Sequence, residues 1–196
     1  MNQNQHRLPS HVRPHKYKIT IAPNLADFTF VGHEIIDIEI DKKTTQLVLH
    51  SLDTKIIDAI WISGKQKQTA KKISYNLKSE TVAFDFAQTI SGKGKLELNF
   101  SGIISEQLHG LYRSKYTHNK QEKHLAVTQF EATDARRAFP CFDEPSHKAV
   151  FDVSVIVPKH LQVISNTVEK SVLAHDKNLK IIHFASTPKM SSYLLA

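Results

Sequence analysis

An alternation of apolar and charged residues constrains the fold of this chain more than any other feature of its sequence. In Ile36–Asp41 three isoleucines alternate with two aspartates and one glutamate, so an extended chain would have one apolar and one acidic side. The same period of two recurs in three further segments, Lys16–Ile21, Leu96–Ser101 and Phe151–Val157. No segment of useful length repeats every 3.6 residues. The sequence therefore predicts an all-β fold built from half-buried strands.

Polar and glycine-containing segments predict where the strands end. Two hairpins are expected, Ile73–Leu77 with Val82–Phe86 and Val168–Leu173 with Leu179–Phe184. Further strands are expected at Leu47–Leu49, Ile56–Ile62, Leu161–Ser165 and Met190–Leu195. Turns or irregular segments are expected at Leu8–Pro14, Lys42–Thr45, Gly92–Gly94 and Thr117–Lys123, and a helical turn at Ala132–Ala138 capped by Thr133 or Asp134. This spacing indicates an antiparallel, multi-stranded twisted sheet or sandwich, and it does not distinguish a sandwich from a barrel.

Length and composition narrow the classes of protein to which the chain can belong. Its 196 residues fit a single domain, and 40% apolar with 23% charged residues is ordinary for a globular fold. No run approaches the roughly 20 apolar residues of a membrane span, and the first residues show no secretory signal. The lone cysteine excludes an internal disulfide, which favours a cytoplasmic location. We therefore expect no membrane partner.

A net charge of +7 raises the question of nucleic-acid binding. The lysines are scattered, apart from a cluster around Gly64 that is typical of a solvated hairpin loop: Lys65, Lys67, Lys71 and Lys72. No aromatic-rich strand motif or helix-turn-helix pattern accompanies them. The sequence therefore favours no nucleic-acid partner.

Twelve histidines and one cysteine are the candidates for metal or thiol chemistry. His11 and His15 have the spacing of a HExxH motif, but Pro14 lies between them and no glutamate follows His11, so the required helix is not expected. Cys141 lies between Pro140 and Phe142, where a thiol is more often inert packing than a nucleophile. We expect no metal site and no catalytic residue in this chain.

The least generic stretch is Thr128–Pro145, TQFEATDARRAFPCFDEP. It begins at the end of an apolar, strand-like run. Because residues two apart in a strand point to the same face, Gln129 and Glu131 are expected to lie side by side with Phe130 packing behind them. The pair would present an amide and a negative charge together.

This stretch resembles the signature in the N-terminal domain of zinc aminopeptidases of the aminopeptidase N family, without a gap. Three further stretches agree with that family in the same order: LPSHVRPHKYKITIAPNL (Leu8–Leu25), GLYRSKY (Gly110–Tyr116) and TPKMSSYLLA (Thr187–Ala196). The resemblance implies that residues 1–196 are a single, saddle-like N-terminal β domain. The GAMEN loop and the HExxH motif of the family's catalytic domain do not occur in the sequence. Zinc would belong to the full-length enzyme, and this fragment alone is expected to be inactive.

The resemblance also implies roles for individual residues. Glu131 would bind the free α-amino group of a peptide substrate, together with the glutamate of the GAMEN loop, and Gln129 would line the pocket for the first side chain. Structural roles are implied for Tyr112, Arg113, Arg136, Arg137, Asp143 and Glu144. The partners would be a peptide with a free N-terminus and the protein's own catalytic domain, which we expect to meet Gln129, Glu131 and apolar residues around Phe139 and Phe142. The alternative is a non-catalytic β-sandwich binding module or an inactive family member.

Overall fold

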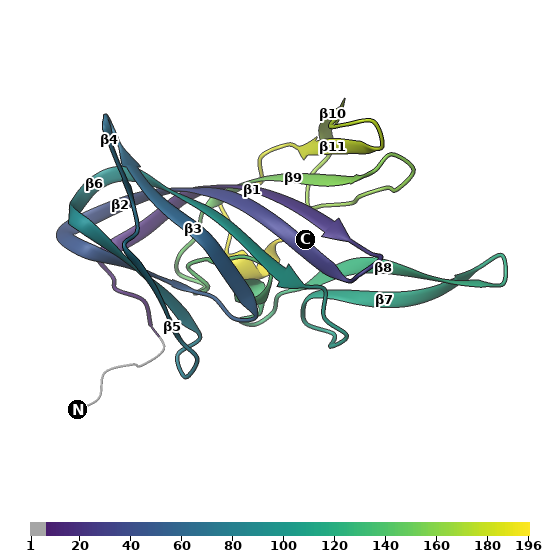
Figure 1. Ribbon diagram of the computed structural model, residues 1–196, viewed down its shortest axis with the longest axis horizontal. Coiled ribbons are helices and arrows are strands. Elements are labelled where there is room, and N and C mark those ends of the chain that lie inside the picture. Colours follow the sequence, from purple (N-terminus) through teal and green to yellow (C-terminus); the bar gives the residue numbers. More distant parts are fainter. Residues whose placement is uncertain (1–6) are drawn as a thin grey trace.

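The computed structural model describes residues 7–196, which form eleven strands and two short 3₁₀ helices (Figure 1). The strands are β1 (Val12–Asn24), β2 (Thr29–His50), β3 (Thr54–Ser63), β4 (Gln66–Thr69), β5 (Lys72–Asn76), β6 (Thr81–Ile103), β7 (Gly110–His118), β8 (Gln121–Gln129), β9 (Val150–Pro158), β10 (Glu169–Ala174) and β11 (Leu179–Phe184). The 3₁₀ helices are Ala135–Arg137 and Ser192–Leu194. Within this described part, no helix has the length and apolar character needed to cross a membrane. The expected all-β fold is confirmed.

Nine strands form one twisted sheet in the order β10-β11-β9-β1-β2-β6-β3-β4, with β5 also paired to β6 (Figure 1). Neighbours are antiparallel except β1 and β9, which run parallel from Lys16↔Val150 to Ile21↔Val155. The expected antiparallel, multi-stranded sheet is therefore confirmed, with this one parallel pair as an exception. Alternation shows which side chains are buried, but it does not reveal the direction of a neighbour more than a hundred residues away.

Two very long strands, β2 and β6, replace the separate shorter strands that the sequence predicts. The predicted turn at Lys42–Thr45 is wrong, because β2 continues through it to His50. The pairing of β2 with β6 shifts register between Ile40 and Thr44, opposite Gly92, whose φ of +71° suits glycine. The shift means that β2 has more residues here than the facing part of β6. Extra residues of this kind bend a strand without ending it. Polar composition at this point marks a bend in the sheet and not a chain reversal.

Four more local predictions are wrong in whole or in part. Leu8–Pro14 is not irregular throughout, because β1 begins at Val12, and Thr117–Lys123 is the end of the β7–β8 hairpin and not a loop. Leu161–Ser165 is not a strand, although Leu161 and Val163 pack against a small cluster of Val157, Ile182 and Phe184. Met190–Leu195 contains the second 3₁₀ helix, since the side chains of Ser191 and Ser192 bond to the stretch that precedes β9.

Two glycines make room for aromatic rings of the core. Phe100 lies over Gly32, its cross-strand partner, and Phe30 lies over Gly102 in the same way. A Cβ atom on Gly32 would come within 2.2 Å of Cζ of Phe100, far inside van der Waals contact. The close packing of β2 against β6 therefore depends on a hydrogen atom at position 32.

We expect Gly32→Ala to lower the free energy of unfolding by about 1–3 kcal/mol, because Phe100 must leave its place. The neighbouring Val31→Ala is the control, since Val31 is 55% exposed and its truncation should change stability by less than about 0.5 kcal/mol. Urea unfolding of both variants measures the difference. Equal stability of the two variants would contradict this packing.

Glu34 is a carboxyl group inside the apolar core. It occupies the inward-facing position on β2, two residues before the buried Ile36, and both of its carboxyl oxygens lack a hydrogen-bond partner. Burial raises its pKa well above the ordinary value of a glutamate. Tyr17 and Cys141 lie close enough for the Glu34 charge to raise their pKa values further, after the larger effect of their own burial. Glu34 is thus a cost to the fold whenever it is ionised.

Replacing Glu34 by leucine should stabilise the protein increasingly as the pH rises. In the wild type the pKa of Glu34 is higher in the folded state than in the unfolded state. The loss of stability that comes from ionising Glu34 is therefore absent below about pH 4.3 and grows as the pH rises from the unfolded pKa to the folded pKa. The stability difference between Glu34→Leu and wild type should increase by up to about 1.4 kcal/mol per pH unit in that window. Urea unfolding from pH 4 to 8 measures it, and a difference independent of pH would refute the burial of an unpaired carboxyl.

Candidate functional site

Gln129 and Glu131 lie together at the end of the β7–β8 hairpin. Gln129 is the last residue of β8, and Glu131 follows two residues later, in a turn. Both side chains are exposed, whereas Phe130 is only 3% exposed and packs edge-on against Phe139 at a ring distance of 6.0 Å. The amide and the carboxylate are therefore open to solvent, and the residue between them anchors the chain to the core.

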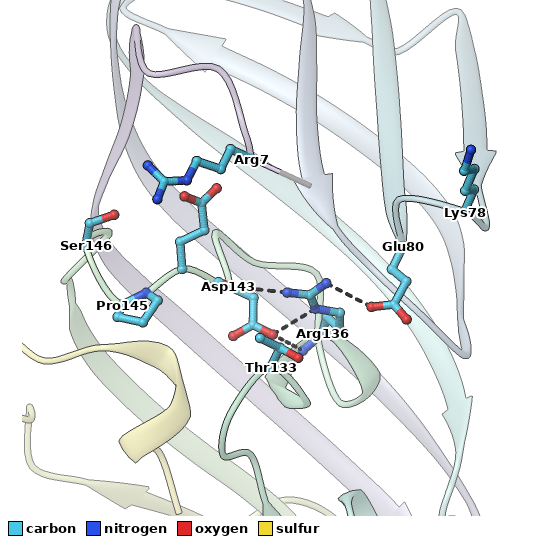
Figure 2. A pocket seen from close by; sticks show the side chains of 9 residues that line it. Arg7, Lys78, Glu80, Thr133, Arg136, Asp143, Pro145 and Ser146 are labelled. Carbon is cyan, nitrogen blue, oxygen red and sulfur yellow. Dashed lines mark hydrogen bonds and ion pairs between the residues drawn. The ribbon is translucent and has the colours of Figure 1, made fainter. Parts of the chain in front are cut away.

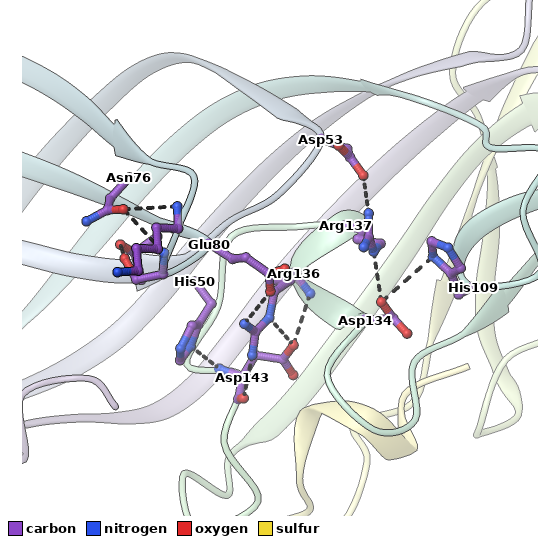
Figure 3. A network of polar contacts seen from close by, with 12 residues as sticks. His50, Asp53, Asn76, Glu80, His109, Asp134, Arg136, Arg137 and Asp143 are labelled. Carbon is purple, nitrogen blue, oxygen red and sulfur yellow. Dashed lines mark hydrogen bonds and ion pairs between the residues drawn. The ribbon is translucent and has the colours of Figure 1, made fainter. Parts of the chain in front are cut away.

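Arg136 and Asp143 join the two ends of the loop that follows Glu131 (Figure 3). Nε of Arg136 donates to Oδ2 of Asp143 at 3.0 Å, and its Nη2 donates to the backbone oxygen of Asp143 at 3.2 Å. Its Nη1 donates to Oε2 of Glu80 at 2.9 Å, in the turn just before β6. The Asp143 side chain is 1% exposed and also accepts from Ser192 Oγ at 2.6 Å. The two buried charges therefore neutralise each other and fix the loop.

Arg137, the next residue, ties the same loop to two other parts of the chain. Its Nε donates to Oδ1 of Asp134 at 2.8 Å, and its Nη1 forms an ion pair with Asp53. Its Cβ lies against Gly110, whose φ of +69° and lack of a side chain allow this approach at the start of β7. Arg137 thus connects the loop to the base of the hairpin that carries Gln129.

Backbone contacts fasten the loop to the sheet. His50, at the end of β2, and Cys141 exchange two backbone hydrogen bonds, of 2.8 and 3.0 Å. The backbone N–H of Phe142 donates to the hydroxyl of Tyr17 at 3.1 Å, and that of Asp143 donates to Nδ1 of His50 at 3.2 Å. These contacts hold residues 141–143 against the sheet, and so they help to fix the loop that follows Glu131.

The structural roles expected for the charged residues agree with these contacts, but the expected apolar surface does not. Phe139 and Phe142 are 2% and 1% exposed, so they are core residues and cannot form the exposed patch that the sequence predicts. The sequence predicts that apolar residues around Phe139 and Phe142 lie on the surface that meets the catalytic domain. In the structure they turn under the loop, where Phe139 packs against Tyr17 and Phe151.

A cleft of about 640 Å³ lies beside the loop, between the N-terminal segment and the turn before β6 (Figure 2). Three carboxylates line it, and each already has a partner: Asp143 and Glu80 bind Arg136, and Oε1 of Glu144 accepts from the backbone of Leu8 at 2.7 Å. Gln129 and Glu131 do not line this cleft. The two candidate substrate residues thus lie on exposed surface outside this cleft.

Cys141 is fully buried, and its thiol has no disulfide partner. Burial raises its pKa well above the usual value, and the nearby Asp143 and Glu34 raise it further. A protonated, inaccessible thiol is a poor nucleophile. The structure therefore agrees with the packing role predicted for Cys141.

The two histidines with HExxH spacing do not share a helix. His15 is in β1, not in a helix, and its Nε2 lies 2.9 Å from Oε2 of Glu39. Across residues 7–196, no three His, Cys, Asp or Glu side chains converge as metal ligands would. The described chain therefore offers no set of residues that fits a zinc ion.

Sequence reasoning missed several residues that hold the site in place. His50, Glu80 and Ser192 meet the loop from distant parts of the chain, and no local pattern points to them. Glu34 was detectable, because it stands on the side of β2 that carries Ile36, Ile38 and Ile40. A charged residue on the same face of a strand as buried isoleucines indicates a charged group inside the core.

Removing Arg136 should destabilise the protein far more than removing Arg137. Arg136→Met leaves Asp143 buried without its cation, which costs about 3–5 kcal/mol. Arg137→Met is the matched control, because its partner Asp53 has a 60% exposed side chain and such surface pairs contribute about 1 kcal/mol or less. Chemical unfolding compares the two. The assignment fails if Arg136→Met costs no more than Arg137→Met.

Comparisons with known proteins agree with the resemblance. A family model described as the peptidase M1 N-terminal domain matches residues 13–194. Aminopeptidase 2 of Candida albicans is 38% identical over 198 residues, covering 100% of this chain and 21% of the relative. Aminopeptidase M1 of Arabidopsis thaliana and puromycin-sensitive aminopeptidase of Caenorhabditis elegans are also 38% identical, each over 97% of this chain and over 22% and 20% of the relative. The chain thus spans about a fifth of the length of these relatives.

Proposed function

The chain belongs to the peptidase M1 family as an N-terminal domain, and from this premise we propose that it serves a zinc-dependent aminopeptidase that removes residues from the N-termini of peptides. Its relatives are named as aminopeptidases, which supports the activity class. Zinc would be held by the catalytic part of the full-length protein, since residues 7–196 offer no matching set of ligands. Its chemistry there would be to polarise the peptide carbonyl and to activate water.

The observation that carries the proposal is the exposed carboxylate of Glu131 on a rigid base. An aminopeptidase must recognise the end of a chain, and the α-ammonium group is the feature that distinguishes this end. A carboxylate that accepts a charge-assisted hydrogen bond from the ammonium fixes the position of the first peptide bond. Glu131 directly follows the buried Phe130 and precedes the loop that the Arg136–Asp143 ion pair closes. Its backbone is therefore held on both sides before substrate binds.

Gln129 is proposed to contact the first side chain of the peptide. It is the last residue of β8, and its side chain is exposed, as is that of Glu131 two residues later. An amide can both donate and accept hydrogen bonds, so it suits contact with varied side chains. The two residues together would form the edge of the substrate site, and the rest of the site would come from the catalytic domain.

Glu131→Gln in the full-length protein tests this function. Losing a charge-assisted hydrogen bond worth roughly 1.5–3 kcal/mol should lower kcat/KM for free-amine peptides about 10- to 100-fold. N-acetylated peptides, which lack the ammonium group, should be poor substrates of both proteins. Zinc content and Tm should stay unchanged, because Glu131 is exposed.

The control is Glu169→Gln, the same chemical change on the exposed start of β10. It should leave kcat/KM within twofold of wild type. If Glu131→Gln also remains within twofold, or if it removes the zinc, Glu131 does not have the proposed role.

A further inference from the structure

The β7–β8 hairpin stands apart from the nine-stranded sheet (Figure 1). Its strands pair over their full length, from Gly110↔Gln129 to His118↔Gln121, and only Asn119 and Lys120 form the turn. A two-stranded hairpin alone in water is at best marginally stable, because it has neither a third strand nor another element packed on its face. One of its faces packs on the core, and the other leaves Tyr116 and Leu125 exposed in the described chain.

The covered face packs on the rest of the domain. Leu111 and Ala126 are partly buried against the main core. The ring of Phe28 contacts His124 edge-on at 4.9 Å, and the guanidinium of Arg113 lies over the same ring at 3.9 Å. Since these side chains alternate along the hairpin, the residues between them face the opposite way.

The outward face carries an apolar stripe that belongs to neither core cluster of residues 7–196. Its members are Tyr112 and Val127, which form one cross-strand pair, and then Leu125 and Tyr116 further toward the turn. Tyr116 is 44% exposed and Leu125 is 39% exposed, while Tyr112 and Val127 are half buried. Gln129 has the same strand parity as Val127 and Leu125, so the stripe leads directly to the candidate substrate residues.

Charge is unevenly distributed beyond the stripe. Near the turn, Nζ of Lys115 pairs with Oε1 of Glu122 at 3.0 Å. Lys120 and Lys123 form no ion pair within residues 7–196. A partner that fits this face would therefore offer an apolar strip bordered by carboxylates.

We propose that the outward face of the hairpin, defined by Tyr112, Tyr116, Leu125 and Val127, is the surface on which the catalytic part of the aminopeptidase rests. The inference depends on the proposed function and adds its contact surface. Glu131 can meet a peptide bound elsewhere only if that part covers the surface next to Gln129. The relatives are about five times as long as this chain, which leaves ample protein to do so. This surface replaces the one expected around Phe139 and Phe142.

Cysteine labelling of the full-length protein tests the contact. Leu125→Cys should react with a maleimide at least tenfold more slowly than Leu77→Cys, the control on the turn between β5 and β6, where Leu77 is 80% exposed. Each rate is normalised to that of the denatured protein, and mass spectrometry assigns the labelled site. The native Cys141 is buried and should not interfere. Tyr116→Cys is the second variant if Leu125→Cys does not fold.

Equal labelling rates at positions 125 and 77 would overturn the proposal. Protection that disappears on dilution would also overturn it, because the covering partner would then be a second copy of the protein. Neither outcome depends on catalysis. If the contact fails but Glu131→Gln has the expected effect, the proposed function stands. If position 125 is protected but Glu131→Gln has no effect, only the role of Glu131 is refuted.

Discussion

The buried ion pair of Arg136 and Asp143 is the constraint on which the candidate site depends. It closes the loop that links the β7–β8 hairpin to β9 of the main sheet, and Glu80 and Ser192 are further partners. Neither charge is accessible enough to bind a ligand of its own. Their contribution is the fixed conformation of the segment after Glu131. Buried charges are costly unless they are matched, so this arrangement also makes the loop sensitive to any change in it.

The same organisation separates the candidate substrate residues from the cleft beside the loop. Gln129 and Glu131 are open to solvent, while the cleft beside the loop is lined by charges that already have partners. An exposed carboxylate is not strongly desolvated and gains its full effect only when another surface lowers the local dielectric. The outward face of the β7–β8 hairpin would bring that surface to Glu131. Substrate recognition would then belong to the junction and not to this domain alone.

Much of the fold could be predicted from the sequence, because half-buried strands give a simple signal. The alternation in Ile36–Asp41 correctly indicates a strand with its isoleucines inside. Features set by distant partners could not be predicted. The parallel contact of β1 with β9 and the bend of β2 depend on pairing that the local pattern does not contain. The β7–β8 hairpin was mistaken for a loop at its end because strands that are polar on both faces lack alternation.

For the site, the sequence predicts that Gln129 and Glu131 share a face; the structure shows both side chains exposed on either side of the buried Phe130. The sequence predicts that Phe139 and Phe142 lie on the surface, but both are buried in the core, and nothing in the local sequence shows that the loop turns them inward.

The most direct test of the central claim is a double-mutant cycle in the full-length protein. It compares the Kd values of a peptide-like inhibitor and its desamino analogue for wild type and Glu131→Gln. Removing the amino group should weaken binding to wild type by about 10- to 100-fold and to the variant by less than about threefold. Equal losses in both proteins would show that Glu131 does not bind the α-amino group.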